Sequence, residues 1–274
     1  MQIILSPLRE LAGFDQLKDA LKRDEAICSV SGLADSQKLH MIYGLGEGFR
    51  TKVIVACNAL KAKELMEEYR FYDRNVSLYP AKDLIFFQAD IHGNQLVRER
   101  VRVIRRLMER KPITIVTTYD AMMTPLTLWD PETDCITLEK GGLLQERELS
   151  AKLVNFGYEK VYQVESPGQF AVRGGIIDIF DLTEENPYRI ELWGDEIDSM
   201  RSFDVLSQRS IEQLESLTVY PATEFVMDEE RMNRGLQRIE KEAQQRVKKL
   251  RDAFETEAAH RLSLQVKELR EQLV

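Results

Sequence analysis

Histidine and cysteine are scarce in this chain of 274 residues, which holds three of each. His40, His92 and His260 lie far apart in the sequence, and the cysteines show neither CxxC spacing nor a paired framework. A metal site needs several such ligands close together, and a nucleophilic centre needs a base beside its nucleophile. We therefore predict no metal site, no catalytic residues and no cofactor.

The chain also lacks long apolar runs and an excess of positive charge. No stretch approaches the roughly 18 apolar residues that a membrane-spanning helix needs, and the first residues lack the basic and apolar regions of a signal peptide. We therefore expect a cytoplasmic protein. The formal net charge of −8 repels phosphate, so nucleic-acid binding would need a local basic patch.

Residues 1–128 alternate short apolar runs with amphipathic stretches, which predicts helices packed over a mostly parallel sheet. Three runs, Ala26–Val30, Lys52–Ala56 and Pro112–Thr118, are short and rich in β-branched residues. We predict that all three are buried strands.

A basic helix is predicted between the second and third of these strands. Its apolar positions run from Val97 to Met108 at helical spacing. Its opposite face carries Arg98, Arg102, Arg105, Arg106 and Arg110. This face either contacts a phosphate backbone or, as we favour, is solvated and paired with acidic neighbours such as Glu99 and Glu109.

A glycine and a lysine follow the first predicted strand at the spacing of a phosphate-binding loop, G-x-x-x-x-G-K-[ST]. Gly32 and Lys38 keep that spacing, but Gln37 replaces the second glycine and Leu39 replaces the hydroxyl residue that would hold magnesium. The segment is therefore either a degenerate nucleotide loop or an ordinary strand-to-helix turn. Both interpretations argue against ATP hydrolysis.

Residues 129–222 change to short strands with close turns, which predicts a smaller α+β domain with an antiparallel sheet. A short helix is expected to end at Gly157, and strands are expected at Ile176–Phe180, Tyr188–Trp193 and Glu196–Phe203. Asp178 stands inside an apolar strand with no histidine or cysteine nearby. We interpret it as a hydrogen-bond acceptor that locks a turn, in preference to a general base.

Arginine and aromatic side chains beside turns favour protein recognition on this sheet over catalysis. The residues in question are Phe170, Arg173 and Arg189, with flanking glycines. Arg189 has an alternative interpretation as the ion-pair partner of Glu191 or Asp195.

Residues 223–274 are dense in charge and carry apolar residues at helical spacing, which predicts a long helix or a helical hairpin bending near Thr256 to Ala259. Packing of this segment on the first domain is favoured over a coiled-coil dimer, because its apolar stripe varies in size. The stripe reaches the last residue, so we expect the natural chain to continue beyond Val274.

One string in the second region resembles a known family. It reads Pro167-Gly168-Gln169-Phe170-Ala171-Val172-Arg173-Gly174-Gly175-Ile176-Ile177-Asp178-Ile179-Phe180, and it is followed by Pro187–Leu192, Asp195–Ile197, Phe203-Asp204 and Ser207–Ser210. Gly157-Tyr158, and Tyr79-Pro80 with the acidic and aromatic stretch after it, extend the match. These segments resemble the amino-terminal region of transcription-repair coupling factors, the Mfd family. The resemblance spans most of residues 1–225.

The resemblance implies a module like the excision-repair protein UvrB. It implies an α/β, RecA-like (P-loop NTPase-type) domain at 1–128 with a degenerate nucleotide loop, a UvrA-docking α+β domain at 129–222 and a helical segment at 223–274. The degenerate loop would comprise Gly32, Gln37, Lys38 and Leu39, and the UvrA-facing surface would comprise Phe170, Arg173, Gly174 and Arg189.

The resemblance also implies a function. A non-catalytic module would recruit UvrA in transcription-coupled nucleotide excision repair, and other domains of such a protein would bind RNA polymerase and move on double-stranded DNA with ATP. The alternative is an active ATPase or helicase-type lobe that binds ATP, through Lys38, and DNA.

Overall fold

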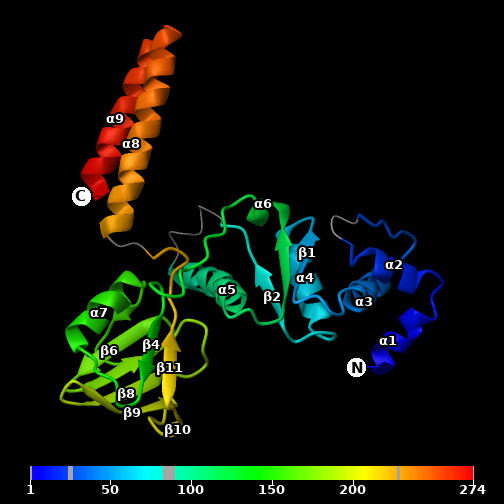
Figure 1. Cartoon of the computed structure of the whole chain (residues 1–274), viewed down its shortest axis with the longest axis horizontal. Coiled ribbons are helices and arrows are strands. Elements are labelled where there is room, and N and C mark those ends of the chain that lie inside the picture. Colours follow the sequence, from blue (N-terminus) through cyan, green and yellow to red (C-terminus); the bar gives the residue numbers. More distant parts are fainter. Residues whose placement is uncertain (1, 24–26, 83–89, 227–228, 274) are drawn as a thin grey trace. The chain divides into compact units, whose positions relative to one another are not determined.

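The structure, a computed structural model, describes residues 2–23, 27–82, 90–226 and 229–273 (Figure 1). It divides into two compact units, residues 1–225 and 226–274. The acidic and aromatic stretch after Pro80 falls on residues 83–89 and lies outside the described residues, as does Ala26.

The first unit begins with helices and a small parallel sheet. The elements are α1 (Gln2–Arg9), α2 (Phe14–Ala20), α3 (Asp35–Leu45), β1 (Thr51–Ala56), α4 (Ala59–Tyr69), β2 (Val76–Tyr79), α5 (Asp90–Met108), β3 (Ile113–Thr118) and α6 (Tyr119–Met122). The strands pair in the order β1-β3-β2, and both pairings are parallel. The strands predicted at Lys52–Ala56 and Pro112–Thr118 are confirmed as β1 and β3.

The predicted strand at Ala26–Val30 is wrong. Residues 27–30 form no strand and are exposed, and the side chain of Ile27 is 98% exposed. A strand needs a hydrogen-bonded neighbour, and the described pairings of the parallel sheet involve only β1, β2 and β3. An apolar run without such a neighbour gains no backbone hydrogen bonds from an extended, buried conformation.

Two helices cover the opposite faces of the parallel sheet. Met66 and Tyr69 of α4 join Val76 of β2 in one core cluster, with Leu78 packed against it. Val103 of α5 joins Tyr79 and Ile115 in another cluster. Because side chains of a strand alternate between faces, α4 and α5 lie on opposite sides of β2.

The rest of the first unit is mainly antiparallel. Its elements are β4 (Ile136–Glu139), α7 (Glu146–Asn155), β5 (Glu159–Lys160), β6 (Gln169–Arg173), β7 (Ile176–Ile179), β8 (Tyr188–Trp193), β9 (Glu196–Phe203), β10 (Ser210–Gln213) and β11 (Ser216–Val219). Six strands pair in the order β10-β9-β8-β7-β6-β5, and β11 pairs with β4. The predicted helix and antiparallel strands are confirmed, and the first unit is mixed α/β.

Buried and partly buried ion pairs join the two sheet regions. The guanidinium of Arg105 on α5 lies 3.5 Å from Asp181, which follows β7, and 2.7 Å from Glu184. Burial raises the pKa of Asp181 although the charge of Arg105 opposes that rise. Arg100, which is fully buried, pairs with Glu224 at 2.8 Å. Two arginines of the predicted basic helix therefore hold the first unit together.

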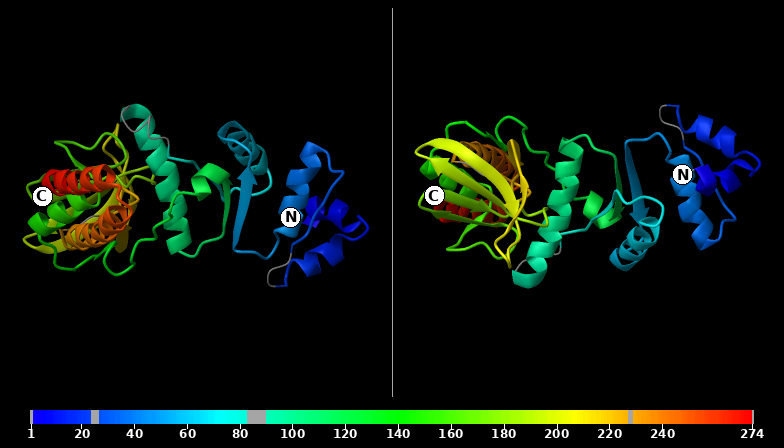
Figure 2. Two further views of the ribbon diagram at one scale, coloured as in Figure 1. Left: turned by 90° about the horizontal axis from the view of Figure 1, so that it is seen from above. Right: turned by 90° about the horizontal axis from the view of Figure 1, so that it is seen from below.

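The second unit is a helical hairpin. α8 (Glu229–Asp252) and α9 (Thr256–Leu273) lie side by side in every view (Figures 1 and 2). Phe254 forms the turn with a positive φ of 61°. Of the two predicted alternatives, the hairpin is present, and its packing on the first domain stays a prediction. No helix in the described part of the chain combines the length and apolar character needed to cross a membrane.

Candidate functional site

A buried carboxylate lies at the centre of the six-stranded sheet. Asp178 on β7 is 1% exposed, and Arg189 lies directly opposite it on β8. Arg189 donates from Nε to Oδ1 of Asp178 at 2.7 Å and from a terminal nitrogen to Oδ2 at 2.8 Å. Arg173 on β6 donates to Oδ2 at 2.8 Å. One carboxylate thus orders two arginines from two neighbouring strands.

Further contacts fix the direction of Arg189. Its guanidinium stacks over the ring of Phe203, with the carbon 4.2 Å from the ring centroid. It also donates to the side-chain oxygen of Gln208 at 2.9 Å. The predicted alternative partners of Arg189 were Glu191 and Asp195, and the structure gives Asp178 instead. The prediction that Asp178 accepts hydrogen bonds is confirmed.

A second ion pair extends the charged row. Arg201 on β9 lies opposite Arg189 and donates to Glu191 at 2.6 Å, and Ser199 donates to the same carboxylate at 2.8 Å. The hydrogen bond from Arg201 lowers the pKa of Glu191 to about 2. We call Arg173, Asp178, Arg189, Glu191 and Arg201 the charged face of the sheet.

A two-residue turn places Arg173 at the end of its strand. Arg173 pairs with Ile176, so only Gly174 and Gly175 connect β6 to β7. Both glycines have positive φ, 55° and 85°, as a hairpin turn of this type requires. Gly174 is exposed, and Gly175 donates its N–H to Glu146 on α7 at 3.1 Å.

Phe170 does not belong to the exposed surface on which it was predicted. Its side chain is fully buried. The side chains of a strand alternate between faces, so Phe170 points away from the face that carries Arg173. Ile177 and Ile190 are fully buried on that same apolar side. Phe170 therefore supports the sheet from beneath and cannot contact a partner directly in this structure.

The charged face is suited to recognising an anionic group on a partner. The side chain of Arg173 is 34% exposed and keeps free N–H donors, while Asp178 holds its position. Tyr162, whose side chain is 84% exposed, lies with its ring centroid 5.8 Å from the Arg173 guanidinium. Ordering these side chains before binding reduces the entropy that binding costs. Arginine presents planar, directional donors to a carboxylate.

The glycine and lysine loop pairs its lysine with a carboxylate of the same segment. Gly32 has a φ of 78° and is exposed. Lys38 pairs with Asp35 at 2.8 Å, and that hydrogen bond lowers the pKa of Asp35. Gln37 accepts a hydrogen bond from the Ala34 N–H at 3.0 Å and so caps α3. Leu39 is 2% exposed within the core.

Sequence reasoning missed Arg201 of the charged face, and it missed Tyr162 beside Arg173. Glu191 was named only as a possible partner of Arg189, whereas the structure pairs it with Arg201. The alternation along Tyr188–Trp193 and Glu196–Phe203 could have predicted part of the charged face, because it puts Arg189, Glu191 and Arg201 on one face. The pairing of Asp178 with Arg189 also needs the strand register, which the loop between β7 and β8 does not reveal.

The described residues offer no ligand set for a metal. They contain no group of three or more histidine, cysteine, aspartate or glutamate side chains arranged to hold an ion. Around Asp178 the neighbours are arginines, so its carboxylate is fully engaged. The arrangement is one for binding an anion or a protein surface.

Comparison with known proteins shows which families the chain is similar to. Residues 136–225 match the family described as the UvrB interaction domain. The chain is 31% identical over 265 residues to the transcription-repair-coupling factor of Bacillus subtilis, covering 90% of this chain and 22% of that protein. It is 31% identical over 264 residues to the UvrABC system protein B of Fervidobacterium nodosum, covering 90% of this chain and 40% of that protein.

A further transcription-repair-coupling factor, from Staphylococcus aureus, is 30% identical over 236 residues and covers 84% of this chain. The chain spans 20% to 40% of the length of these relatives. The match to the UvrB interaction domain contains the whole of β6 to β9 and therefore the charged face. Residues 136–225 thus match the UvrB interaction domain, and most of the chain is similar in sequence to a part of transcription-repair-coupling factors and of UvrABC system protein B.

Proposed function

We propose that this chain is a non-catalytic docking module that binds UvrA through the charged face of its antiparallel sheet. The observation that carries the proposal is the buried Asp178, which orders Arg173 and Arg189 within the UvrB interaction domain. A buried carboxylate that engages two arginines is a costly arrangement, since charges lose hydration on burial. Binding of a partner protein by the two arginines would explain why the domain keeps this buried carboxylate.

The proposed surface comprises Arg173, Gly174 and Arg189, with Tyr162 at its side. Gly174 is exposed and its missing side chain leaves open space, so a partner can approach the backbone there. In this role the chain would recruit UvrA for nucleotide excision repair coupled to transcription. Contacts with RNA polymerase and double-stranded DNA would belong to the rest of a longer protein.

The proposal includes the domain division expected from the sequence. Residues 1–128 would form a RecA-like domain whose nucleotide loop at Gly32 to Leu39 is degenerate, and 129–222 would form the docking domain. The lack of a strand at 27–30 and the pairing of Lys38 with Asp35 support a loop that does not hold ATP. No observation favours the alternative of an active ATPase or helicase-type lobe.

Calorimetric titrations with UvrA and, separately, with ATP test the proposal. We expect saturable binding to UvrA and no heat from ATP. The control variant Lys38→Ala removes the only lysine at the loop spacing and is expected to leave both results unchanged. Saturable ATP binding that Lys38→Ala abolishes, together with no UvrA binding, would favour the ATPase interpretation and refute the docking proposal.

A further inference from the structure

The parallel sheet has an open edge at β2. Within the described residues β2 pairs only with β3, through Val76 to Tyr79. The N–H of Thr114 on β3 donates to the carbonyl of Asn75 at 2.9 Å. Residues that bond to one neighbour alternate along a parallel strand, so Val76 and Leu78 turn their backbone groups to the open side. Such an edge is a template for another extended chain.

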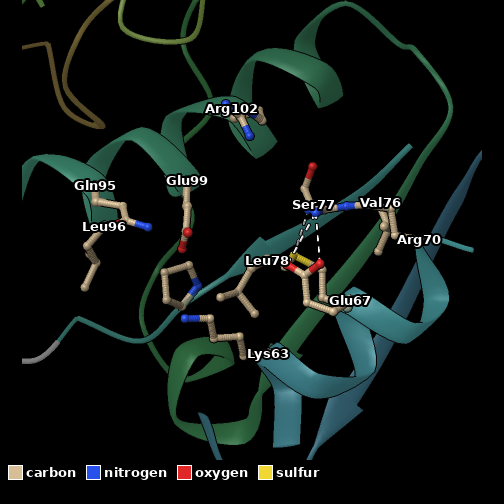
Figure 3. Close-up of a pocket in the computed structure, with 12 residues that line it drawn as sticks. Lys63, Glu67, Arg70, Val76, Ser77, Leu78, Gln95, Leu96, Glu99 and Arg102 are labelled. Carbon is tan, nitrogen blue, oxygen red and sulfur yellow. Dashed lines mark hydrogen bonds and ion pairs between the residues drawn. The ribbon is translucent and has the colours of Figure 1, made fainter. Parts of the chain in front are cut away.

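A groove runs along this edge between two helices. Because α4 and α5 cover opposite faces of the sheet, side chains from both project past β2 (Figure 3). They enclose a cavity of about 620 Å³. Met66 of α4, Leu78 of β2 and Leu96 of α5 give it apolar walls. Lys63, Arg70 and Arg102 lie at the same cavity and are labelled in Figure 3.

A second cavity of about 620 Å³ continues the groove, since both are lined by Arg70, Val76, Ser77 and Arg102. Its lining adds Arg74, Arg98 and Arg106. Arg98, Arg102 and Arg106 follow one another at intervals of four on α5 and so form one row.

In the described part of the chain, most of these arginines form no ion pair. Among the described residues Arg74, Arg102 and Arg106 form no ion pair, and Arg70 pairs with Glu67 at 3.0 Å. Arg98 donates to the carbonyl of Glu184, and its Nε is buried without a hydrogen-bond partner. Burial and the neighbouring charge of Arg98 lower the pKa of Arg102. An anionic ligand would relieve this crowding of positive charge.

The groove also contains carboxylates. Glu67 and Glu99 line the first cavity, and Glu184, Glu185 and Glu212 line the second. Glu67 is engaged by Arg70 and Glu184 by Arg105. Burial raises the pKa of Glu99, which disfavours its charged form. The surface is therefore mixed in charge, with its unpaired positive groups in a row beside the strand edge.

We propose that this groove binds an acidic protein segment in extended conformation, which adds to β2 as a fourth strand. Backbone hydrogen bonds to Val76 and Leu78 would supply affinity. Alternate side chains would place carboxylates at Arg98, Arg102 and Arg106 and apolar groups against Met66 and Leu78 on the other face. The proposal is independent of UvrA docking, because none of the charged face lines the groove.

A peptide fits these features better than a nucleic acid. A strand edge pairs with a peptide backbone and offers nothing equivalent to a sugar-phosphate chain. The apolar walls suit side chains, and the interspersed glutamates repel a continuous row of phosphates more than spaced carboxylates. Nucleic-acid binding is therefore the competing outcome of the test.

Fluorescence anisotropy of the full chain tests the proposal with a labelled peptide in which valine alternates with glutamate. We expect saturable binding, at least about tenfold weaker for Arg102→Glu. Arg102 forms no ion pair among the described residues, and its side chain reaches solvent at the groove, so this variant is expected to fold. Arg147→Glu on α7, also exposed and outside the groove, is the matched control and is expected to bind as the unsubstituted chain does.

Two further probes separate strand addition from simple charge attraction. A peptide of the same sequence with methylated backbone nitrogens cannot pair with β2, and we expect its binding to be lost. A labelled DNA duplex is expected to compete poorly. Three results would each overturn the proposal. The methylated peptide could bind as tightly as the unmethylated one, Arg147→Glu could weaken binding as much as Arg102→Glu, or the chain could bind the DNA duplex more tightly than the peptide.

Discussion

Gly32 and Gly174 are both glycines with positive φ, and a cationic residue lies near each in the sequence, but their surroundings differ. Residues 27–31 before Gly32 form no strand, and Lys38, six residues after it, is exposed and bonded to Asp35. Before and after Gly174 the strands β6 and β7 pair, and Arg173 bonds to the buried Asp178. Of these two cationic side chains, only that of Arg173 is held in a fixed position, because the paired strands β6 and β7 bring Asp178 to it.

The largest effect that sharpens this comparison is expected from Phe170→Ala. Phe170 is fully buried under the charged face, so its truncation leaves a cavity and costs about 3–5 kcal/mol in the free energy of unfolding. Urea unfolding followed by fluorescence measures the change. Phe71→Ala, at a side chain that is 82% exposed, is the matched control and should have little effect. A small loss for Phe170→Ala would argue that this side chain is not part of the core.

Asp178→Ala is expected to have the next largest effect, about 2 kcal/mol of lost stability. Removal of the carboxylate leaves Arg189, largely buried, without its partner, although the more exposed Arg173 can turn toward solvent. The same urea experiment measures it. Asp198→Ala removes an exposed carboxylate from the same sheet and should change little. Equal effects of the two substitutions would contradict a structural role for Asp178.

The acid stability of the sheet should depend on Glu191. Its folded pKa is about 2, below the ordinary value of 4.5, so its ionised form is favoured by folding. The resulting stability is complete above pH 4.5 and is lost as pH falls toward 2. Glu191→Gln should therefore lower stability by about 1 kcal/mol at neutral pH, after allowance for solvent exposure, and flatten the acid limb.

Unfolding curves between pH 7 and pH 2 provide the measurement for this prediction. Glu148→Gln, at an exposed position on α7, is the control. If Glu191→Gln kept the full acid dependence of the unsubstituted chain, the ion pair with Arg201 would have no energetic role.

The smallest effect is expected from Lys38→Ala. Both members of the Lys38–Asp35 pair are largely exposed, at 57% and 83% of their side chains, so solvent screens their attraction. The urea midpoint should not change measurably, and its value should not depend on added ATP. If ATP raised the urea midpoint and Lys38→Ala removed that rise, the loop would bind nucleotide. The contrast between the segments at Gly32 and Gly174 would then be wrong.

Part of this structure follows from sequence pattern. The runs at Lys52–Ala56 and Pro112–Thr118 are parallel strands, and the alternation of Tyr188–Trp193 marks an antiparallel one, because each run has partners of its own kind. The run at Ala26–Val30 looks equivalent in composition, and its described residues 27–30 form no strand. The residue pattern shows which segments are able to form a strand. A segment forms one only where a neighbouring strand is available for hydrogen bonding.

The candidate site was predicted less completely for a related reason. Arg173, Gly174 and Arg189 lie on or beside the charged face, whereas Phe170 lies on the opposite one. Alternation along β6 would have separated Phe170 from Arg173, but the register that joins Asp178 to Arg189 depends on the loop between β7 and β8. The row at Arg98, Arg102 and Arg106 was visible as a basic helix, and only the fold shows that it borders a strand edge.

The most direct test of the central claim is a calorimetric titration of UvrA with the chain and with two variants, Arg173→Ala and Arg147→Ala. Each variant removes one arginine that solvent reaches, and of the two only Arg173 is ordered by Asp178. We predict that Arg173→Ala weakens binding at least tenfold, about 1.4 kcal/mol, while Arg147→Ala leaves the affinity unchanged. Equal affinities for all three proteins, or no binding by any, would contradict docking through the charged face.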